Sequence, residues 1–208
     1  MKPAGIIKEG AVQLGVNLTP GQIGALVAYL EELLKWNKKV NLTSIDEPRE
    51  AAIKHFLDSL ALCRVLPVGG IEAIDIGTGA GFPGLVLAVA RPEMAMALLD
   101  PSRKKGSFMK HVIRSLGLSN VSVLEEKVES LVLEYPGRFG AVFSRAFKDL
   151  PLLLPHAAVL LKPGGLLIQS LGPGSLWEPT PGWEAVRDES VSLPFSDIVR
   201  RLLVLRKA

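Results

Sequence analysis

An apolar run that passes directly into a glycine-dense turn constrains the fold of this chain more than any other feature. Ile71–Ile76 reads as a buried strand and Phe82–Arg91 as a helix, and between them lie Gly77, Gly79 and Gly81. Glycine tolerates positive φ angles and lets a backbone approach a ligand closely. A strand, a glycine turn and a helix in this order predict an α/β fold with a ligand site at the carboxyl end of the strand.

Short β-rich runs alternate with helical patterns over the rest of the chain. A helix is predicted at Lys104–Leu116, and Leu160–Ile168 reads as a helix end, a Pro-Gly-Gly turn and the start of a strand. Gly172–Gly182, rich in proline and glycine, reads as a loop. Further strands are predicted at Ala95–Leu99, Val121–Leu124, Ala141–Ser144, Leu166–Leu171 and Val199–Leu205. This alternation predicts a parallel, doubly wound sheet.

Residues 1 to about 67 have a different pattern and read as helical. Thr19 is a candidate N-cap, with Pro20 at the first helical position. Apolar residues then recur at three- and four-residue steps and mark one helix face, at Ile23, Leu26, Leu30, Leu33 and Leu34. A second helix is predicted at Pro48–Leu66. We therefore expect a helical region, residues 1–67, packed on a ligand-binding domain, residues 68–208.

The composition indicates a globular protein of a reducing compartment. Hydrophobic residues make up 48% of the chain and charged residues 22%, which allows a sizeable core. The one cysteine, Cys63, excludes an internal disulfide framework and is expected to be a small packed thiol. The N-terminus shows no signal-peptide pattern, and the densest apolar stretch, Leu150–Leu161, contains prolines and is too short for a bilayer. We expect a cytoplasmic protein without a membrane segment.

Two classes of cofactor fit the glycine turn. Gly79–Gly84 matches G-x-G-x-x-G, and Asp100 follows about twenty residues later, as in dinucleotide sites. Counted from Gly77 instead, the turn follows Asp75, an acid at the end of the strand. S-adenosylmethionine carries an ammonium and a sulfonium group that Asp75 would attract, whereas a dinucleotide pyrophosphate would be repelled. Asp100 can accept hydrogen bonds from ribose hydroxyls in either case. This difference in charge favours S-adenosylmethionine.

Basic residues gather in Pro101–Asn120, which contains no acid. These residues are Arg103, Lys104, Lys105, Lys110 and Arg114. In a chain of net charge +3, a cationic helix beside the cofactor site predicts contact with RNA phosphates, although a solvated helix face fits the charge pattern as well. A second basic group, Lys35, Lys38 and Lys39, flanks Trp36. Trp36 is either a base-stacking platform or, the interpretation we favour, a core anchor.

Several segments together match one family. They are Trp36-Asn37 with Asn41–Thr43, His55–Leu60, Asp75–Gly84, Leu99-Asp100 with Lys104-Lys105, Val128-Glu129 and Ser144–Ala146. Over roughly residues 30 to 170 the chain resembles the bacterial small-subunit ribosomal RNA guanine-N7 methyltransferases, also called the glucose-inhibited division protein B family. The resemblance implies a class I methyltransferase fold, Rossmann-like, with a mostly parallel seven-stranded sheet and an N-terminal helical extension. Leu160–Ile168 resembles the stretch before the sixth strand, and Val199–Leu205 the antiparallel seventh.

The same resemblance implies a reaction and its residues. Members of the family use S-adenosylmethionine to methylate N7 of a guanine in the 530 loop of 16S ribosomal RNA. The expected partner is therefore 16S RNA or the small ribosomal subunit, and the expected form is a monomer. Cofactor contacts are implied at Gly77, Phe82, Val128, Glu129 and Arg145. The chain departs from the family in Leu171-Gly172-Pro173, which lacks a usual lysine, and in Lys127, which replaces an arginine.

Methylation at guanine N7 requires no general base, because that nitrogen carries a lone pair and no proton. Catalysis then depends on alignment and on exclusion of water. His55 and Asp58, three residues apart on one helix face, either line the substrate site or form a packing hydrogen bond. Arg145 follows a predicted strand and is a candidate for positioning the substrate or the cofactor. No spacing of His, Cys or acidic residues indicates a metal site.

Other functions fit the same residues. The chain could methylate a different RNA, a protein or a small molecule, or it could be a non-catalytic RNA-binding module. A nicotinamide enzyme is the least favoured alternative. Cofactor titration and methyl transfer to candidate substrates discriminate among these functions.

Overall fold

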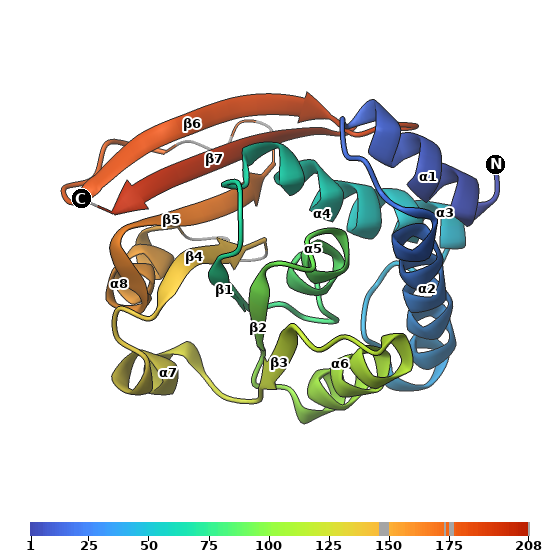
Figure 1. The fold of residues 1–208 in the computed structure, drawn as a ribbon, viewed down its shortest axis with the longest axis horizontal. Coiled ribbons are helices and arrows are strands. Elements are labelled where there is room, and N and C mark those ends of the chain that lie inside the picture. Colours follow the sequence, from blue (N-terminus) through green and yellow to red (C-terminus); the bar gives the residue numbers. More distant parts are fainter. Residues whose placement is uncertain (146–149, 173, 175–176, 208) are drawn as a thin grey trace.

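A seven-stranded sheet forms the centre of the molecule (Figure 1). The computed structural model describes residues 1–145, 150–172, 174 and 177–207. The strands are β1 (Glu72–Ile76), β2 (Ala95–Leu99), β3 (Val121–Leu124), β4 (Phe139–Ser144), β5 (Leu161–Leu171), β6 (Trp183–Ser192) and β7 (Val199–Lys207), in the order β3-β2-β1-β4-β5-β7-β6. β1 to β5 pair in parallel, whereas β7 pairs antiparallel with β5 and β6. The predicted doubly wound, mostly parallel sheet with an antiparallel final strand is confirmed.

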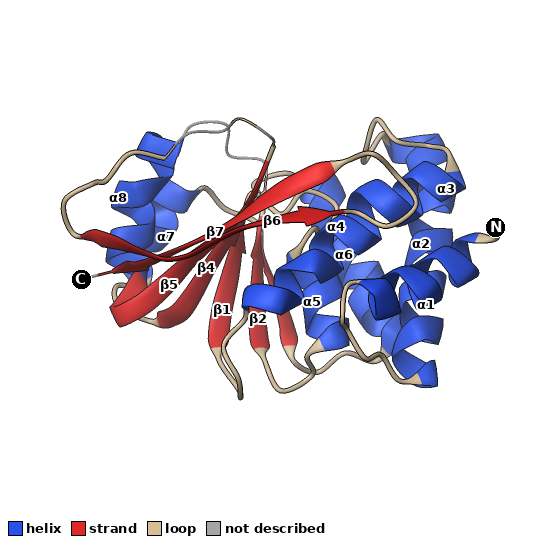
Figure 2. Cartoon of the chain, turned by 90° about the horizontal axis from the view of Figure 1, so that it is seen from above, coloured by secondary structure: helices blue, strands red, loops and turns tan. Residues whose placement is uncertain are grey.

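Helices cover both faces of the sheet (Figure 2). On one face lie α1 (Pro3–Gln13), α2 (Pro20–Val40), α5 (Gly84–Ala90) and α6 (Arg103–Leu116), and on the other lie α7 (Val128–Glu134) and α8 (Leu150–Leu160). Along β1, Ala73 packs in the apolar cluster of the first face and Ile74 in that of the second. This alternation follows from the two-residue period of a strand.

The segment between α2 and the sheet is buried around most of its circumference. The sequence predicts one helix over Pro48–Leu66, but the structure divides the run into α3 (Pro48–Ala51), a π-helical segment (Ala52–Leu57), α4 (Asp58–Ala61) and a 3-10 turn (Leu62–Val65). Apolar periodicity does not reveal a π-helical segment, because the pattern stays helical while the faces rotate. Such segments are frequent at functional sites. The predicted N-cap of α2 is confirmed: Thr19 and Gln22 form a reciprocal capping box.

The main differences from the prediction are one missed strand and two shifted element starts. The sequence missed β6, an edge strand with charged residues on both faces and one buried side chain, that of Val191. β5 begins before the Pro-Gly-Gly turn, pairs Leu161 with Phe139, and then shifts register, so this turn lies within the fifth strand in chain order and does not precede the sixth. α5 begins at Gly84 because the glycine turn extends two residues further than predicted.

The N-terminal helices share one apolar cluster with the sheet, which includes Tyr29 of α2 and Phe143 of β4. The division into residues 1–67 and 68–208 stays a prediction. Within the described ranges, no helix is long and apolar enough to cross a membrane, and no group of His, Cys, Asp and Glu could hold a metal ion. Cys63 is half-buried, and burial raises the pKa of its thiol to about 12, so it is a neutral packing group.

Candidate cofactor and substrate site

The glycine turn forms an open cradle at the carboxyl end of β1. Gly77 and Gly79 have φ angles of 72° and 64°, and a Cβ atom on either would meet no atom within 4 Å. Both positions therefore favour glycine, and both face open space. Gly81 differs, since a Cβ there would lie 2.7 Å from the Tyr29 hydroxyl. The same hydroxyl donates to the Ala80 carbonyl at 2.5 Å, so Tyr29 of α2 packs against the glycine turn and fixes its backbone.

Asp75 lies beneath this cradle and is fully buried. Its Oδ2 accepts a hydrogen bond of 2.7 Å from the Gly84 amide. Burial raises the pKa of Asp75 to about 6, against smaller opposing effects from the nearby Thr78 hydroxyl, from that amide and from Arg145. The Thr78 hydroxyl lies close enough to this carboxylate to lower its pKa, but among the described residues neither Asp75 Oδ1 nor that hydroxyl makes a hydrogen bond of good geometry. Buried polar atoms are normally paired, so these two atoms fit a ligand that brings its own donor, such as an ammonium group.

Asp100 links the end of β2 to the same cradle. Its carboxylate accepts hydrogen bonds from the backbone amides of Gly79 and Ser102, each at 3.0 Å. Lys105 donates to it at 3.2 Å. A carboxylate has about four lone-pair sites, so Asp100 keeps capacity for a ribose hydroxyl. Lys105 is a predicted RNA contact, but in the structure it is a partner of this acid.

Val128 and Glu129 begin α7, on the second face of the sheet. Val128 is buried in one cluster with Ile76 and Leu99, the last residues of β1 and β2, and Glu129 is exposed. The structure therefore brings Val128 to the carboxyl edge of the sheet, where the cradle lies. Glu129 is beside it on the surface, and its predicted adenine contact stays a prediction.

Arg145, His55 and Phe82 meet beside the cradle. Arg145 follows β4 and donates to the Lys54 carbonyl at 2.9 Å and to His55 Nδ1 at 3.1 Å. Its guanidinium lies 5.4 Å above the Phe82 ring. The His55 ring stacks on Phe82 with centroids 4.6 Å apart, and Tyr29 also stacks on Phe82, at 5.2 Å. Phe82 thus connects the cradle to the N-terminal helices.

His55 is neutral, and its tautomer follows from its partners. Arginine can only donate, so Nδ1 accepts and Nε2 carries the proton, which it donates to the Thr43 hydroxyl at 2.9 Å. Burial, with the charges of Arg145 and Lys54, lowers the pKa of His55 to about 3. At neutral pH His55 therefore holds Arg145 in place, and it is neither a cation nor a general acid.

Asp58 ties the helical region to the last strands. It is 1% exposed. The Ser170 hydroxyl of β5 donates to its Oδ1 at 2.9 Å, and Arg200 Nε of β7 lies 3.1 Å from both carboxylate oxygens. Arg145 is a more distant partner, at 3.6 Å. The predicted packing interaction is thus present, although its partners are strand residues rather than His55. Sequence reasoning missed Arg200, Ser170 and Tyr29, since no local motif marks them.

These side chains line an open cavity of about 320 Å³, here called the Arg145–Arg200 cavity. It is lined by Ile45, Lys54, His55, Asp58, Arg145, Ser170, Gly172 and Arg200. It adjoins the cradle because His55 and Arg145 both contact Phe82. Gly172, where the family usually has lysine, lies on its wall. Ala146 and Pro173, parts of two family segments, lie outside the described residues.

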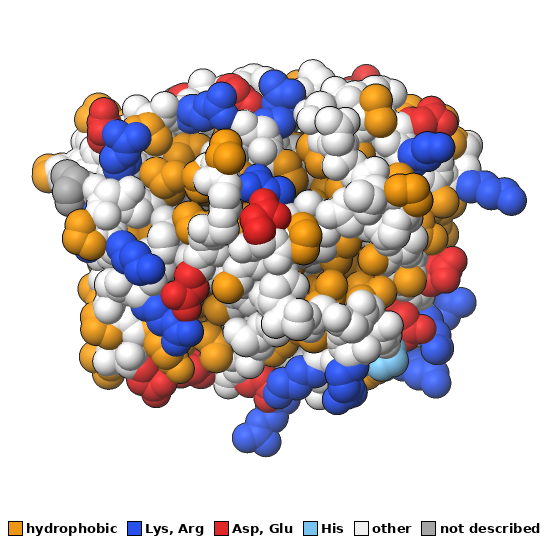
Figure 3. Space-filling view, viewed as in Figure 1, with side chains coloured by type: hydrophobic (Ala, Val, Ile, Leu, Met, Phe, Trp, Pro, Cys, Tyr) orange, Lys and Arg blue, Asp and Glu red, His pale blue; other side chains and the backbone are white. Residues whose placement is uncertain are grey.

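The predicted RNA-contact residues of α6 divide into two groups. Arg103, Lys104 and Arg114 are exposed, whereas Lys110 pairs with Glu125 at 2.8 Å, in addition to the pairing of Lys105. Blue side chains gather along the lower edge of the molecule, over α6 and the neighbouring end of α2 (Figure 3). Trp36 in α2 is half-buried and packs on Phe108 of α6 with ring centroids 5.6 Å apart, as expected of an anchor.

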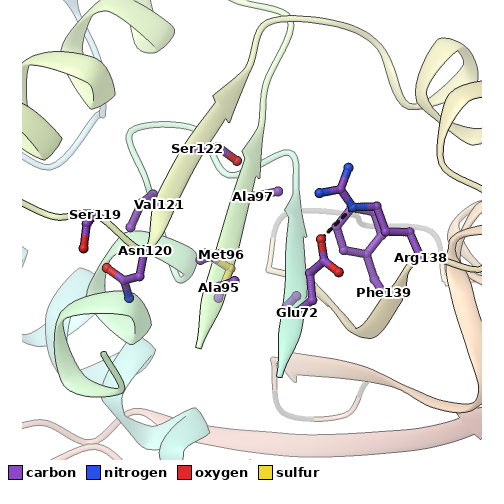
Figure 4. A pocket seen from close by; sticks show the side chains of 11 residues that line it. Glu72, Ala95, Met96, Ala97, Ser119, Asn120, Val121, Ser122, Arg138 and Phe139 are labelled. Carbon is purple, nitrogen blue, oxygen red and sulfur yellow. Dashed lines mark hydrogen bonds and ion pairs between the residues drawn. The ribbon is translucent and has the colours of Figure 1, made fainter. Parts of the chain in front are cut away.

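A second cavity, of about 210 Å³, lies at the amino ends of the strands (Figure 4). Ala95 and Ser122 are among its small lining residues, and Glu72 and Arg138 pair across its edge at 2.6 Å. Ligands of open parallel sheets bind at the carboxyl ends of the strands. This second cavity is therefore separate from the cradle and from the Arg145–Arg200 cavity.

Known proteins match this chain over nearly its whole length. The ribosomal RNA small subunit methyltransferase G of Geobacter metallireducens is 38% identical and covers 96% of this chain and 94% of the relative. The protein of the same name from Alkaliphilus oremlandii is 39% identical, with 97% and 89% covered. A methyltransferase structure from Aquifex aeolicus, described as SAM-dependent, has a TM-score of 0.60 at 16% identity and covers 84% of this chain and 98% of that chain, which shows a shared fold.

The family model matches the same region of the chain. It is described as rRNA small subunit methyltransferase G (GidB), and it aligns with residues 22–176. This range contains the cradle, His55, Asp58 and Arg145, and it ends before β6 and β7. With the curated relatives, the match shows that the chain belongs to the rRNA small subunit methyltransferase G family.

Proposed function

We propose that this protein uses S-adenosylmethionine to methylate N7 of a guanine in the 530 loop of 16S ribosomal RNA. Membership of the family supports methyl transfer to small-subunit RNA. The observation that carries the proposal is the open glycine cradle, with two buried polar atoms that lack a well-formed hydrogen bond among the described residues, directly beside the Arg145–Arg200 cavity. A cofactor site that shares a wall with a cavity for part of the acceptor molecule is what a group-transfer enzyme requires.

The chain has a suitable group for each part of the cofactor. Asp75 and Thr78 supply acceptors for an ammonium group, Gly77 and Gly79 leave room for close backbone approach, and Asp100 accepts from ribose hydroxyls. Val128 and Glu129 remain candidates for the adenine. The bound cofactor supplies an electrophilic methyl group on its sulfonium.

The residues of the chain align the two reactants and keep water out. Guanine N7 attacks with its own lone pair, so no side chain has to remove a proton. His55, neutral and held by Thr43, fixes Arg145 above Phe82, and Asp58 holds the strands that complete the wall. Alignment of this kind supplies up to ~7–11 kcal/mol where the geometry is ideal.

We further propose that the protein acts as a monomer in the cytoplasm, where small ribosomal subunits are assembled. Arg103, Lys104 and Arg114 would contact RNA phosphates from the exposed face of α6. Methyl transfer to a ring nitrogen of folded RNA requires an accessible or displaced base. For this reason the assembled subunit and free 16S RNA are both candidate substrates.

Transfer of a tritiated methyl group to small subunits, free 16S RNA and bulk protein tests this function. We expect label in RNA, at a guanine that becomes sensitive to cleavage at N7-methylated sites. Label in protein alone would indicate a methyltransferase with another substrate. Calorimetry that shows no affinity for the cofactor would favour the non-catalytic RNA-binding module instead.

A further inference from the structure

The Arg145–Arg200 cavity is lined by more positive than negative charge. Among the described residues of the lining, Lys54, Arg145 and Arg200 supply three cations, and Asp58 supplies the one acid. Glu50 pairs with Lys54 at 2.8 Å, but this pair is exposed to solvent on both sides. His55 adds no charge at neutral pH, because its pKa is about 3. The cavity is therefore suited to an anion.

The two arginines also have donors to spare. Arg200 uses Nε for Asp58, and neither of its Nη groups has an acceptor among the described residues. Arg145 uses both Nη groups, and its Nε has no acceptor in the same ranges. Both arginines line the cavity, and their side chains are only 24% and 21% exposed. Guanidinium donors that are fixed by a carboxylate or a backbone carbonyl are pre-organised for phosphate oxygens.

The acceptor base itself is a poor occupant of this cavity. Arginine reads guanine through O6 and N7 together, but N7 has to remain free for the methyl group. The purine also gains positive charge during transfer, and nearby cations would oppose that charge. Asp58 offsets little of it, since Asp58 is 1% exposed and its charge is already paired with Arg200 at 3.1 Å. The cations of this cavity are therefore suited to a neighbouring group of the RNA that stays anionic throughout the reaction.

We infer that the Arg145–Arg200 cavity is a subsite for a backbone phosphate next to the target nucleotide, with Arg200 as its main positioning residue. The inference rests on the proposed function and deepens it. A phosphate held here would fix the sugar and place the base over the cradle. The cofactor and the phosphate would then occupy adjoining sites that share the wall formed by Phe82, His55 and Arg145.

Substitution of Arg200 tests the inference with a matched control on the same strand. Arg200→Gln removes the charge and keeps a donor for Asp58. Arg201→Gln removes the next charge along β7, on the other face, where Arg201 pairs with the exposed Asp188. We expect Arg200→Gln to raise the KM for small subunits about tenfold and to flatten its dependence on salt by about one phosphate contact, ~0.7–0.9 in the logarithmic slope. Arg201→Gln should change neither.

An unchanged salt slope in Arg200→Gln, or an equal change in Arg201→Gln, would overturn the inference. Cofactor affinity, measured in both variants by calorimetry, verifies that they fold. If Arg200→Gln fails that check, Lys54→Gln replaces it, since Lys54 also lines the cavity and its side chain is 37% exposed, and the same flattening is expected.

Direct titration separates the inference from the proposed function. Guanosine, guanosine 5′-monophosphate and inorganic phosphate are titrated into the cofactor-bound protein. We expect the monophosphate to bind at least about tenfold more tightly than guanosine, and this advantage to disappear in Arg200→Gln. Inorganic phosphate should compete with the monophosphate but not with guanosine. Equal affinities for monophosphate and nucleoside would exclude a phosphate subsite even if methyl transfer to RNA proceeds, whereas loss of RNA methylation alone would contradict only the proposed function.

Discussion

Asp75 connects the pH of the solution to cofactor binding. Burial raises its pKa to about 6 in the folded protein, whereas the unfolded chain releases this proton near pH 4. Between these values the ligand-free protein loses stability as pH rises, and above about pH 6 it bears the full cost of a buried charge. An ammonium group favours the carboxylate form. We therefore predict that affinity for S-adenosylmethionine increases as pH rises through about 6, measured by calorimetric titration. Affinity that is independent of pH over this range would contradict the prediction. Asp75→Asn should bind weakly at every pH, and Glu72→Gln, at the other end of β1, should behave like the unsubstituted protein.

Gly79 and Gly137 offer a pair of positions that separates strain from function. Both have a φ angle of 64°, and a Cβ on either would meet no atom within 4 Å. Substitution by alanine should cost each about 1–2 kcal/mol of folding stability, because left-handed backbone disfavours a side chain. Only Gly79→Ala also places a methyl group in the cradle, so it alone should weaken cofactor binding. Thermal unfolding and cofactor titration of both variants measure the two effects. Equal affinity in the two variants would place the cofactor elsewhere.

α6 shows how an element can be predicted while the roles of its side chains are not. Its range, Arg103–Leu116, is within one residue of the prediction, since one face is apolar and the other charged. The sequence did not reveal which of its cations are paired within the protein. Lys105 and Lys110 form ion pairs with acids outside the helix, Asp100 and Glu125. β6 was missed for a related reason. It is an edge strand, so its sequence lacks the alternation of apolar and polar residues that would reveal a strand. The local hydrophobic pattern predicts a helix or strand when one of its faces is buried, but it does not show which side chains of distant segments will pair with it.

The exposed end of α6 carries a prediction for RNA binding. Arg103→Ala with Lys104→Ala should weaken binding to small subunits and flatten its salt dependence by up to about two phosphate contacts, ~0.7–0.9 in slope for each. Cofactor affinity should stay the same, since neither residue contacts the cradle in the described structure. Lys162→Ala with Arg206→Ala removes equal charge from exposed positions on β5 and β7 and serves as the control. Filter binding at several salt concentrations measures the slopes. Equal losses in both double variants would mean that net charge, and not α6, governs binding.

At the scale of the whole molecule, the site is assembled across the entire chain. Asp58 and Arg200 are 142 residues apart in sequence, and their contact fastens the helical region to the last strands. The cofactor cradle could be predicted because Asp75 to Gly84 form one contiguous motif. The Arg145–Arg200 cavity could not, because its residues come from α3 to α4, β5, β7 and the end of β4, and only the folded sheet brings them together. Resemblance identified His55, Asp58 and Arg145 but could not indicate what each one contacts.

Two aspartates that pair with adjacent arginines of β7 test how much this long-range contact stabilises the molecule. Asp58 is buried with Arg200, whereas Asp188, 42% exposed, pairs with Arg201. Removal of one partner from a buried ion pair typically costs ~3–5 kcal/mol, because the remaining charge loses its compensation, and an exposed pair contributes at most about 1 kcal/mol. Asp58→Ala should therefore lower the free energy of unfolding far more than Asp188→Ala, as measured by denaturant titration. Hydrogen exchange should show α4 and β7 opening together in Asp58→Ala only. If the two variants lose equal stability, Asp58 does not hold the helical region to the sheet, and the wall of the phosphate subsite would have to be maintained by apolar packing alone.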